Sequence, residues 1–188
     1  MIYEQLKEYL TPSIAENLVC IFKTGSQLFC TNCKDYDYVI ITKEDVNFPC
    51  FHINELNADC FVMSIETLNK RLQDNQWRYK LSVCLAKIDS SNIIYGELPE
   101  LDIDILSREY LLKIMRIEKE FADKTYFNNK GNKKTIVWGL ALYYYIINNS
   151  FVLSEEQKNK LQKCHDSLIE DSFINTFKSQ LEYLLLVN

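Results

Sequence analysis

Two aspartates separated by one residue, Asp35 and Asp37, are the side chains of this sequence best suited to chemistry. They lie at the start of a run, Tyr36 to Thr42, whose apolar and aromatic composition predicts a strand. Side chains alternate across a strand, so both carboxylates would project from one face, with α-carbons about 6–7 Å apart. Carboxylates this close repel each other unless they share a proton or a cation, and their hard oxygen atoms suit Mg²⁺ or Mn²⁺. The pair therefore predicts a divalent metal site.

A glycine and a serine, Gly25-Ser26, directly follow an earlier predicted strand, Leu18 to Lys23. Glycine allows the backbone to approach a phosphate closely, and a serine hydroxyl or N–H group at the start of a helix can donate to one. A spacer of eight residues separates Ser26 from Asp35. The order of these features indicates a phosphate-binding turn beside the metal site.

This order of strand, Gly-Ser, spacer and Asp-x-Asp within a second strand resembles the nucleotidyltransferase superfamily, which includes DNA polymerase beta and kanamycin nucleotidyltransferase. The resemblance implies an α+β fold, with an N-terminal mixed sheet and its helices followed by a C-terminal helical bundle. It implies that Gly25 and Ser26 bind the nucleotide and that Asp35 and Asp37 bind metal. The spacer is slightly short for the family, so the helix between the two motifs must be abbreviated.

A third carboxylate commonly completes such a site, where it serves the attacking hydroxyl as a metal ligand or base. Asp59 precedes the predicted strand Cys60 to Ser64 and best matches the family's third carboxylate. Glu55 is the alternative, and Asp59 can also be interpreted as a turn residue without a catalytic role. Three downstream cations are candidates for triphosphate contacts, although solvated helix faces carry such residues routinely: Arg71, Arg78 and Lys80.

The function implied by the resemblance is transfer of a nucleoside monophosphate from an NTP to an acceptor hydroxyl, with release of pyrophosphate. Asp35, Asp37 and Asp59 would be the catalytic and metal-binding residues. The alternative is a catalytically silent protein of the same fold that acts as a binding partner, an interpretation raised by the short Gly-Ser spacer. The formal net charge of −5 disfavours RNA as the acceptor, so a small molecule or a protein is favoured.

The elements that would position these residues divide into two predicted domains, 1–105 and 106–188. In the second domain the patterns are helical, with Ser107 as a cap and Ser154 to Gln157 as a capping box. The run Lys134 to Asn148 is apolar nearly all round and is therefore the predicted central helix of the bundle.

Three more patterns complete the first domain. Ser64 is a predicted helix cap, Trp77 to Ala86 has a helical pattern, and Ile93 to Gly96 has the pattern of a short edge strand. A second acid pair, Asp102 and Asp104, lacks a preceding Gly-Ser and is interpreted as part of a connecting segment.

The composition favours a packed globular protein, because 47% of the residues are hydrophobic and only four are glycine. The N-terminal residues are amphipathic and carry acids, unlike a signal peptide. The longest apolar stretch, Thr135 to Ile147, is shorter than the roughly 18 residues typical of a membrane span. We therefore expect a cytoplasmic protein without a membrane partner. A homodimer and a complex with a partner chain are both compatible with the sequence.

The seven cysteines raise one more metal hypothesis, a zinc site formed by Cys30, Cys33, Cys50 and His52. Zinc sites usually leave two or more residues between paired ligands, whereas one residue separates Cys50 from His52. An odd number of cysteines without a secretory signal instead favours reduced, structural thiols.

Purified protein is therefore expected to contain no stoichiometric zinc, and its melting temperature without nucleotide should not change when a chelator is added. Elemental analysis and thermal denaturation check this expectation. One bound zinc per chain would show that the cysteines form a structural metal site.

Overall fold

The computed structural model of the chain combines a five-stranded mixed sheet with helices, in an α+β architecture. Two compact units make up the chain: the first comprises Met1–Leu28 and Asn32–Asp104, and the second comprises Phe29–Thr31 and Ile105–Asn188. The structure describes all residues except 1, 34, 48, 74–76, 102–106, 126–132, 167–170 and 188. Asp102, Asp104 and the predicted domain boundary after residue 105 lie outside the described residues.

The sheet of the first unit has the strand order β3-β4-β2-β1-β5. Its strands are β1 (Leu18–Thr24), β2 (Tyr36–Thr42), β3 (Cys50–Ile53), β4 (Ala58–Ser64) and β5 (Ile93–Gly96). The central pair β2 and β4 is parallel, and the other neighbouring strands are antiparallel. The sequence predicted β1, β2, β4 and the edge strand β5, but it did not predict β3.

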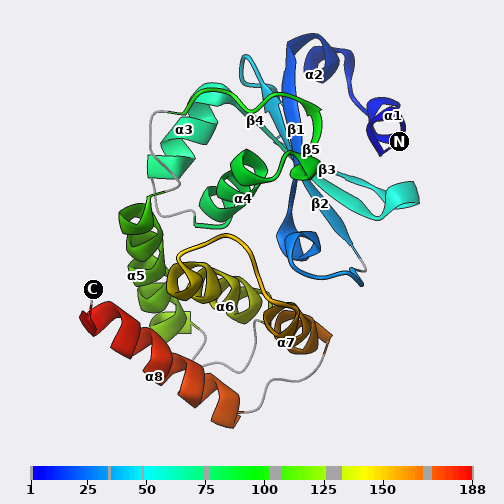
Figure 1. Ribbon diagram of the computed structural model, residues 1–188. Helices are drawn as coiled ribbons and strands as arrows, with labels where there is room; N and C mark the ends of the chain where they lie inside the picture. The colour runs from blue at the N-terminus through cyan, green and yellow to red at the C-terminus, as the bar shows by residue number, and fades with distance from the viewer. Residues whose placement is uncertain are drawn as a thin grey trace. The chain divides into compact units, whose positions relative to one another are not determined.

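One face of the sheet is covered by α1 (Ile2–Lys7) and α2 (Pro12–Asn17), as Figure 1 shows. Thr11 caps α2 by accepting a hydrogen bond from the N–H of Ile14, at 3.4 Å. Alternation along the strands gives this face a buried apolar core. The core is formed by Leu6, Ile14, Ile21, Tyr38, Ile40, Ile53, Ala58, Cys60 and Val62.

The opposite face is covered by α3 (Ile65–Gln73), which packs on β2 and β4, and by α4 (Trp77–Ile88), which packs on β1. Ser64 is confirmed as the cap of α3, because its hydroxyl accepts a hydrogen bond from the N–H of Thr67 at 3.1 Å. A buried hydroxyl pair, Thr24 Oγ1 and Ser82 Oγ at 2.7 Å, connects β1 to α4.

Short 3₁₀ turns connect several of these elements: η1 (Gly25–Leu28), η2 (Asn54–Leu56) and η3 (Ser90–Asn92). The abbreviated helix that the short spacer implied after Gly-Ser is the single turn η1. It begins at the glycine itself and directly follows β1, which keeps the Gly-Ser pair beside the end of the sheet.

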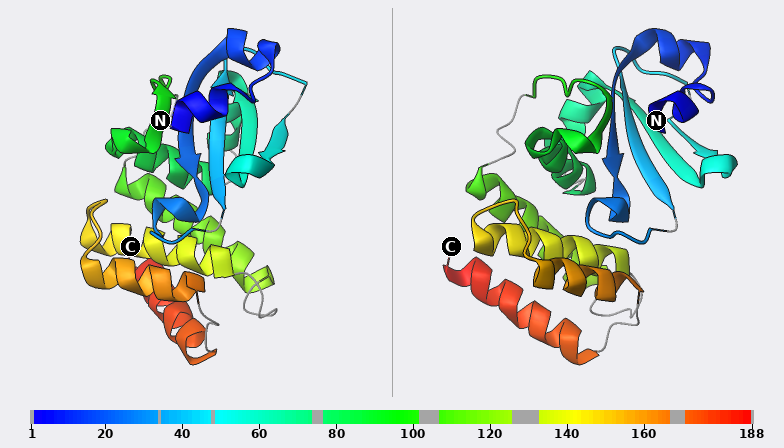
Figure 2. Two further views of the ribbon diagram at one scale, coloured as in Figure 1. Left: turned by 90° about the vertical axis from the view of Figure 1, so that its right-hand side faces the viewer. Right: turned by 45° about the vertical axis from the view of Figure 1, so that its right-hand side comes forward.

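The described residues of the second unit form four helices: α5 (Arg108–Thr125), α6 (Lys133–Asn148), α7 (Glu155–Asp166) and α8 (Asp171–Val187). The apolar helix α6 packs against α5 and α7, and α8 packs against α5, as can be followed in Figure 2. Within the described part of the chain, no helix is both long and apolar enough to cross a membrane.

Two predicted caps of these helices are confirmed. The hydroxyl of Ser107 accepts a hydrogen bond from the N–H of Tyr110 at 3.1 Å, which caps α5. Ser154 and Gln157 form the predicted capping box of α7, with reciprocal backbone-to-side-chain bonds of 2.9 and 3.2 Å.

A charge in the middle of α6 should unfold the protein. Leu140 is 2% exposed and Ile147, on the same helix, is 47% exposed. Because an unpaired carboxylate is costly to bury, we expect Leu140→Asp to lower the free energy of unfolding by more than about 3 kcal/mol, whereas Ile147→Asp should have little effect. Urea denaturation of both variants measures the difference, and a normally stable Leu140→Asp protein would show that α6 is not part of the core.

Candidate functional site

Four polar side chains form a row across four neighbouring strands, on the sheet face that α3 and α4 cover. Thr24 of β1 pairs with Asp37 of β2, Asp37 pairs with Asp59 of β4, and Asp59 pairs with His52 of β3. Residues that face each other in adjacent strands project from the same side of the sheet. The row therefore brings together two of the predicted site residues, Asp37 and Asp59, which are far apart in the sequence.

The predicted nucleotide-binding glycine, Gly25, lies directly against the Asp37 carboxylate. A Cβ atom placed on Gly25 would lie 1.9 Å from Asp37 Oδ2 and 2.7 Å from Asp37 Cγ. The φ angle of Gly25 is +76°, in the left-handed region that favours glycine. Gly25 is therefore required both for the turn of the backbone and for the space that the carboxylate occupies, a second role that the sequence did not reveal.

The rest of the Gly-Ser turn is anchored to the two strands that flank it. The side-chain amide of Gln27 donates to the carbonyl oxygen of Thr24 at 3.0 Å and to the carbonyl oxygen of Asp37. The hydroxyl of Ser26 donates to Cys33 Sγ at 3.8 Å, and Ser26 is only 4% exposed. These contacts fix the turn relative to the start of β2.

The remaining predicted carboxylate, Asp35, is half-buried and lies in the bend just before β2. It is not part of the row of facing residues.

Among the side chains that the structure describes, no group of three or more His, Cys, Asp or Glu residues is placed to hold a metal ion. The donors that do face each other, the carboxylates of Asp37 and Asp59, have the oxygen chemistry that Mg²⁺ and Mn²⁺ prefer, and both ions keep waters or phosphates as further ligands.

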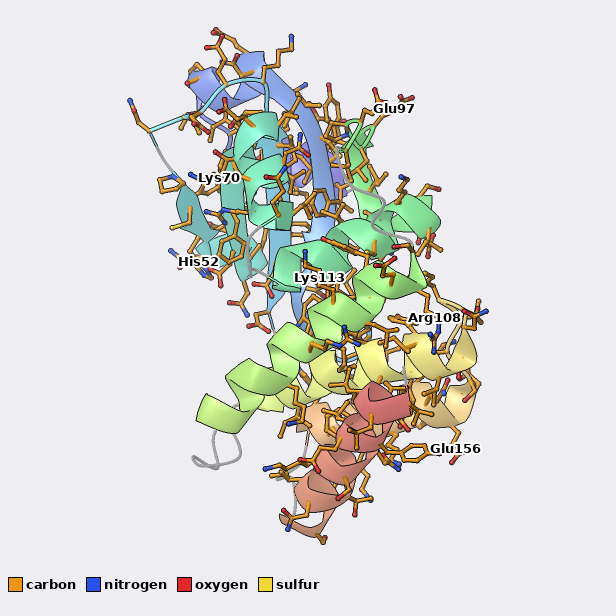
Figure 3. All side chains as sticks on the ribbon, turned by 90° about the vertical axis from the view of Figure 1, so that its left-hand side faces the viewer. His52, Lys70, Glu97, Arg108, Lys113 and Glu156 are labelled. Atoms are coloured by element: carbon orange, nitrogen blue, oxygen red, sulfur yellow. The ribbon has the colours of Figure 1, made fainter. Side chains whose placement is uncertain are left out.

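The strand that the sequence did not predict brings a histidine to the site. His52 Nδ1 lies 2.7 Å from Asp59 Oδ1, and the two side chains are 43% and 47% exposed. His52 is on the edge strand β3, where Figure 3 labels it. In the sequence it was a candidate only for zinc, yet its partner in the structure is the predicted third carboxylate. None of the seven cysteines forms a disulfide bond.

The other candidates lie outside this row. Glu55, the alternative third carboxylate, is exposed in η2. Arg71 is half-buried near the end of α3, whereas the side chains of Arg78 and Lys80 lie outside the described part of α4. The contribution of these cations to nucleotide binding therefore stays a prediction.

The negative charges of the two facing carboxylates contribute to the pKa shifts of buried neighbouring groups. Burial raises the pKa of Cys60 to about 12, and the negative charges of Asp59 and Asp37 contribute to the rise. Burial also raises the pKa of Tyr38 to about 12, with smaller contributions from neighbours that include Asp37. Both groups stay neutral at physiological pH, so they add no further negative charge to this end of the sheet.

Comparisons with known proteins add no family to this description: no protein-family model matches the chain, and no curated protein matches its sequence.

Replacing Gly25 by alanine should displace the Asp37 carboxylate. Because the new Cβ would overlap Asp37 and the φ angle is unfavourable, we expect Gly25→Ala to lower the free energy of unfolding by about 1–3 kcal/mol and to weaken Mn²⁺ binding. Urea denaturation and a Mn²⁺ titration measure the two effects.

Gly96→Ala is the matched control, because Gly96 also has a positive φ, +69°, and its Cβ would lie 2.0 Å from the carbonyl oxygen of Val19. It should lose stability and keep Mn²⁺ affinity. Equal Mn²⁺ affinity in the two variants would contradict the role assigned to Gly25.

Proposed function

We propose that this protein is a Mg²⁺- or Mn²⁺-dependent nucleotidyltransferase, which transfers a nucleoside monophosphate from an NTP to an acceptor hydroxyl and releases pyrophosphate. The observation that carries the proposal is the pairing of Asp37 with Asp59 on adjacent parallel strands, with the Gly-Ser turn against Asp37. A carboxylate pair supplies metal ligands, and a glycine-led turn next to it can bind the phosphates of a nucleotide. The first unit would then be a nucleotidyltransferase-type domain and α5 to α8 its C-terminal bundle.

In this proposal Asp35, Asp37 and Asp59 hold the metal. A bound divalent ion would neutralise charge on the phosphoryl group that is transferred. The backbone N–H groups of the turn at Gly25 and Ser26 bind the terminal phosphates of the nucleotide, while Asp59 orients the attacking hydroxyl and accepts its proton. The protein's main contribution is positioning, because phosphoryl transfer needs little covalent chemistry from side chains.

The acceptor is proposed to be a small molecule or a protein. The chain is acidic, with a net charge of −5, and RNA binding depends on neutralising many phosphates with cations. The protein could work as a homodimer or with a partner chain, and Arg71, Arg78 and Lys80 are the cations assigned to the triphosphate.

A second candidate function is a catalytically silent protein that binds nucleotide or a partner chain. The observation that favours it is the short spacer between the Gly-Ser turn and Asp35, in which the single turn η1 takes the place of a longer helix. Two measurements separate the two functions: calorimetry measures binding of Mg²⁺-ATP, and a second assay measures pyrophosphate release in cell extract. Binding of Mg²⁺-ATP without release of pyrophosphate supports the silent protein.

The two aspartates of the Asp-x-Asp motif provide the decisive variants. Asp37→Asn removes one of two facing negative charges, and Asp35→Asn removes a charge two residues away along the chain, so we expect stability without Mg²⁺ to be equal or higher. Metal-dependent transfer of label from an α-labelled NTP to material in cell extract should be lost. Stability and activity would then move in opposite directions, a combination that an ordinary surface acid does not produce.

Glu44→Gln is the matched control, because Glu44 is an exposed acid in the same unit, just after β2. It should keep both label transfer and Mg²⁺-ATP affinity. If Asp37→Asn binds and transfers nucleotide like Glu44→Gln, the proposed function is wrong.

A further inference from the structure

We propose that His52 is a positioning residue of this site, which holds the carboxylate of Asp59 in the orientation needed for metal binding. This inference rests on the proposed function, and it assigns His52 a role for which its residue type and place in the sequence gave no indication. His52 would touch neither the nucleotide nor the metal, and it would act through Asp59.

The contact between the two side chains has the geometry of a strong hydrogen bond. His52 Nδ1 and Asp59 Oδ1 are 2.7 Å apart, within the usual range for a bond to a charged acceptor. An ionised carboxylate can only accept, so the proton between the two atoms belongs to His52 Nδ1. A neutral imidazole and a charged imidazolium can both donate from this atom, so the contact does not require a particular charge on His52.

The sheet itself places this donor. His52 and Asp59 face each other in the antiparallel pair β3 and β4, and Asp59 faces Asp37 in the parallel pair β4 and β2. Asp59 therefore lies between a hydrogen-bond donor on one side and a second carboxylate on the other. The hydrogen bond from His52 on β3 is made to Oδ1 of Asp59, and Oδ2 of Asp59 takes no part in it.

Asp59 needs such a constraint because its side chain is 47% exposed and Asp37 repels it. Without a donor, the carboxylate would be expected to rotate towards solvent. Hydrogen bonds to the ligands of a metal orient them, and losing one typically weakens metal binding by about 10–100-fold. In contrast, exposed ion pairs contribute little to stability, so the effect of His52 should appear in metal affinity and not in the melting temperature.

The chain contains a natural control for this contact. His165, the other histidine, has Nδ1 3.0 Å from Oδ1 of Asp166 on α7, in the second unit. The two pairs have the same chemistry, and only the pair on β3 and β4 adjoins the facing carboxylates.

The test is a Mn²⁺ titration of the full chain without nucleotide, in which electron paramagnetic resonance measures the free ion. We expect His52→Leu to bind Mn²⁺ about 10-fold more weakly than the parent. His52→Asn should recover most of the affinity, because its amide can donate from a position close to that of Nδ1. His165→Leu should bind like the parent, and all melting temperatures without metal should agree.

Asp37→Asn in the same titration separates failure of this inference from failure of the proposed function. If Asp37→Asn loses Mn²⁺ binding while His52→Leu binds like the parent, the positioning role is wrong and the proposed function stands. If His52→Leu and His52→Asn weaken binding equally, the donor is not what matters and the inference also fails. If the parent binds no Mn²⁺, or Asp37→Asn binds like the parent, the metal site is absent and both proposals fall.

Discussion

The close approach of the Asp37 carboxylate to the backbone of Gly25 is the constraint on which the candidate site depends. A side chain at position 25 would overlap Asp37, and the positive φ angle would disfavour it even without that overlap. Because the turn begins directly after β1, this contact brings the Gly-Ser pair to the start of β2. The register between β2 and β4 then adds Asp59 to the same end of the sheet. One glycine thus allows the Gly-Ser turn and the Asp37 carboxylate to share a small space.

Two carboxylates side by side repel each other in the protein without a bound cation. The residues around them limit the effect of this repulsion on the sheet. The strands are secured by apolar cores on both faces of the sheet, so repulsion at one end does not separate β2 from β4. The buried groups beside the acids, Cys60 and Tyr38, stay neutral because burial raises their pKa. One carboxylate oxygen of Asp59, which is half-exposed, is hydrogen-bonded to His52. Such strain is a common property of sites that bind a cation or change charge during a reaction.

Local patterns in the sequence predicted much of the fold. Alternation and composition gave the bounds of β2 and β5 correctly, and the serines that cap α3, α5 and α7 were identified from residue type and spacing. The strand β3 was missed because its mixed sequence, Cys-Phe-His-Ile, carries little strand signal and the strand forms through pairing with β4, whereas the equally short β5 has the apolar run Ile-Ile-Tyr. Because His52 is on β3, missing this strand also concealed a residue of the candidate site. The second role of Gly25 was also hidden, because it depends on a contact between segments that only the folded sheet brings together.

The central claim is that the Asp-x-Asp motif and the Gly-Ser turn bind a metal and a nucleotide at one place. A crystal structure of the protein with Mn²⁺ and a non-hydrolysable NTP analogue tests this claim most directly, because the anomalous signal of manganese locates the ion. Our account predicts a manganese peak beside the carboxylates of Asp35, Asp37 and Asp59, with the terminal phosphates of the analogue against the backbone at Gly25 and Ser26. A nucleotide bound elsewhere, or crystals in which no manganese lies beside these carboxylates, would contradict it.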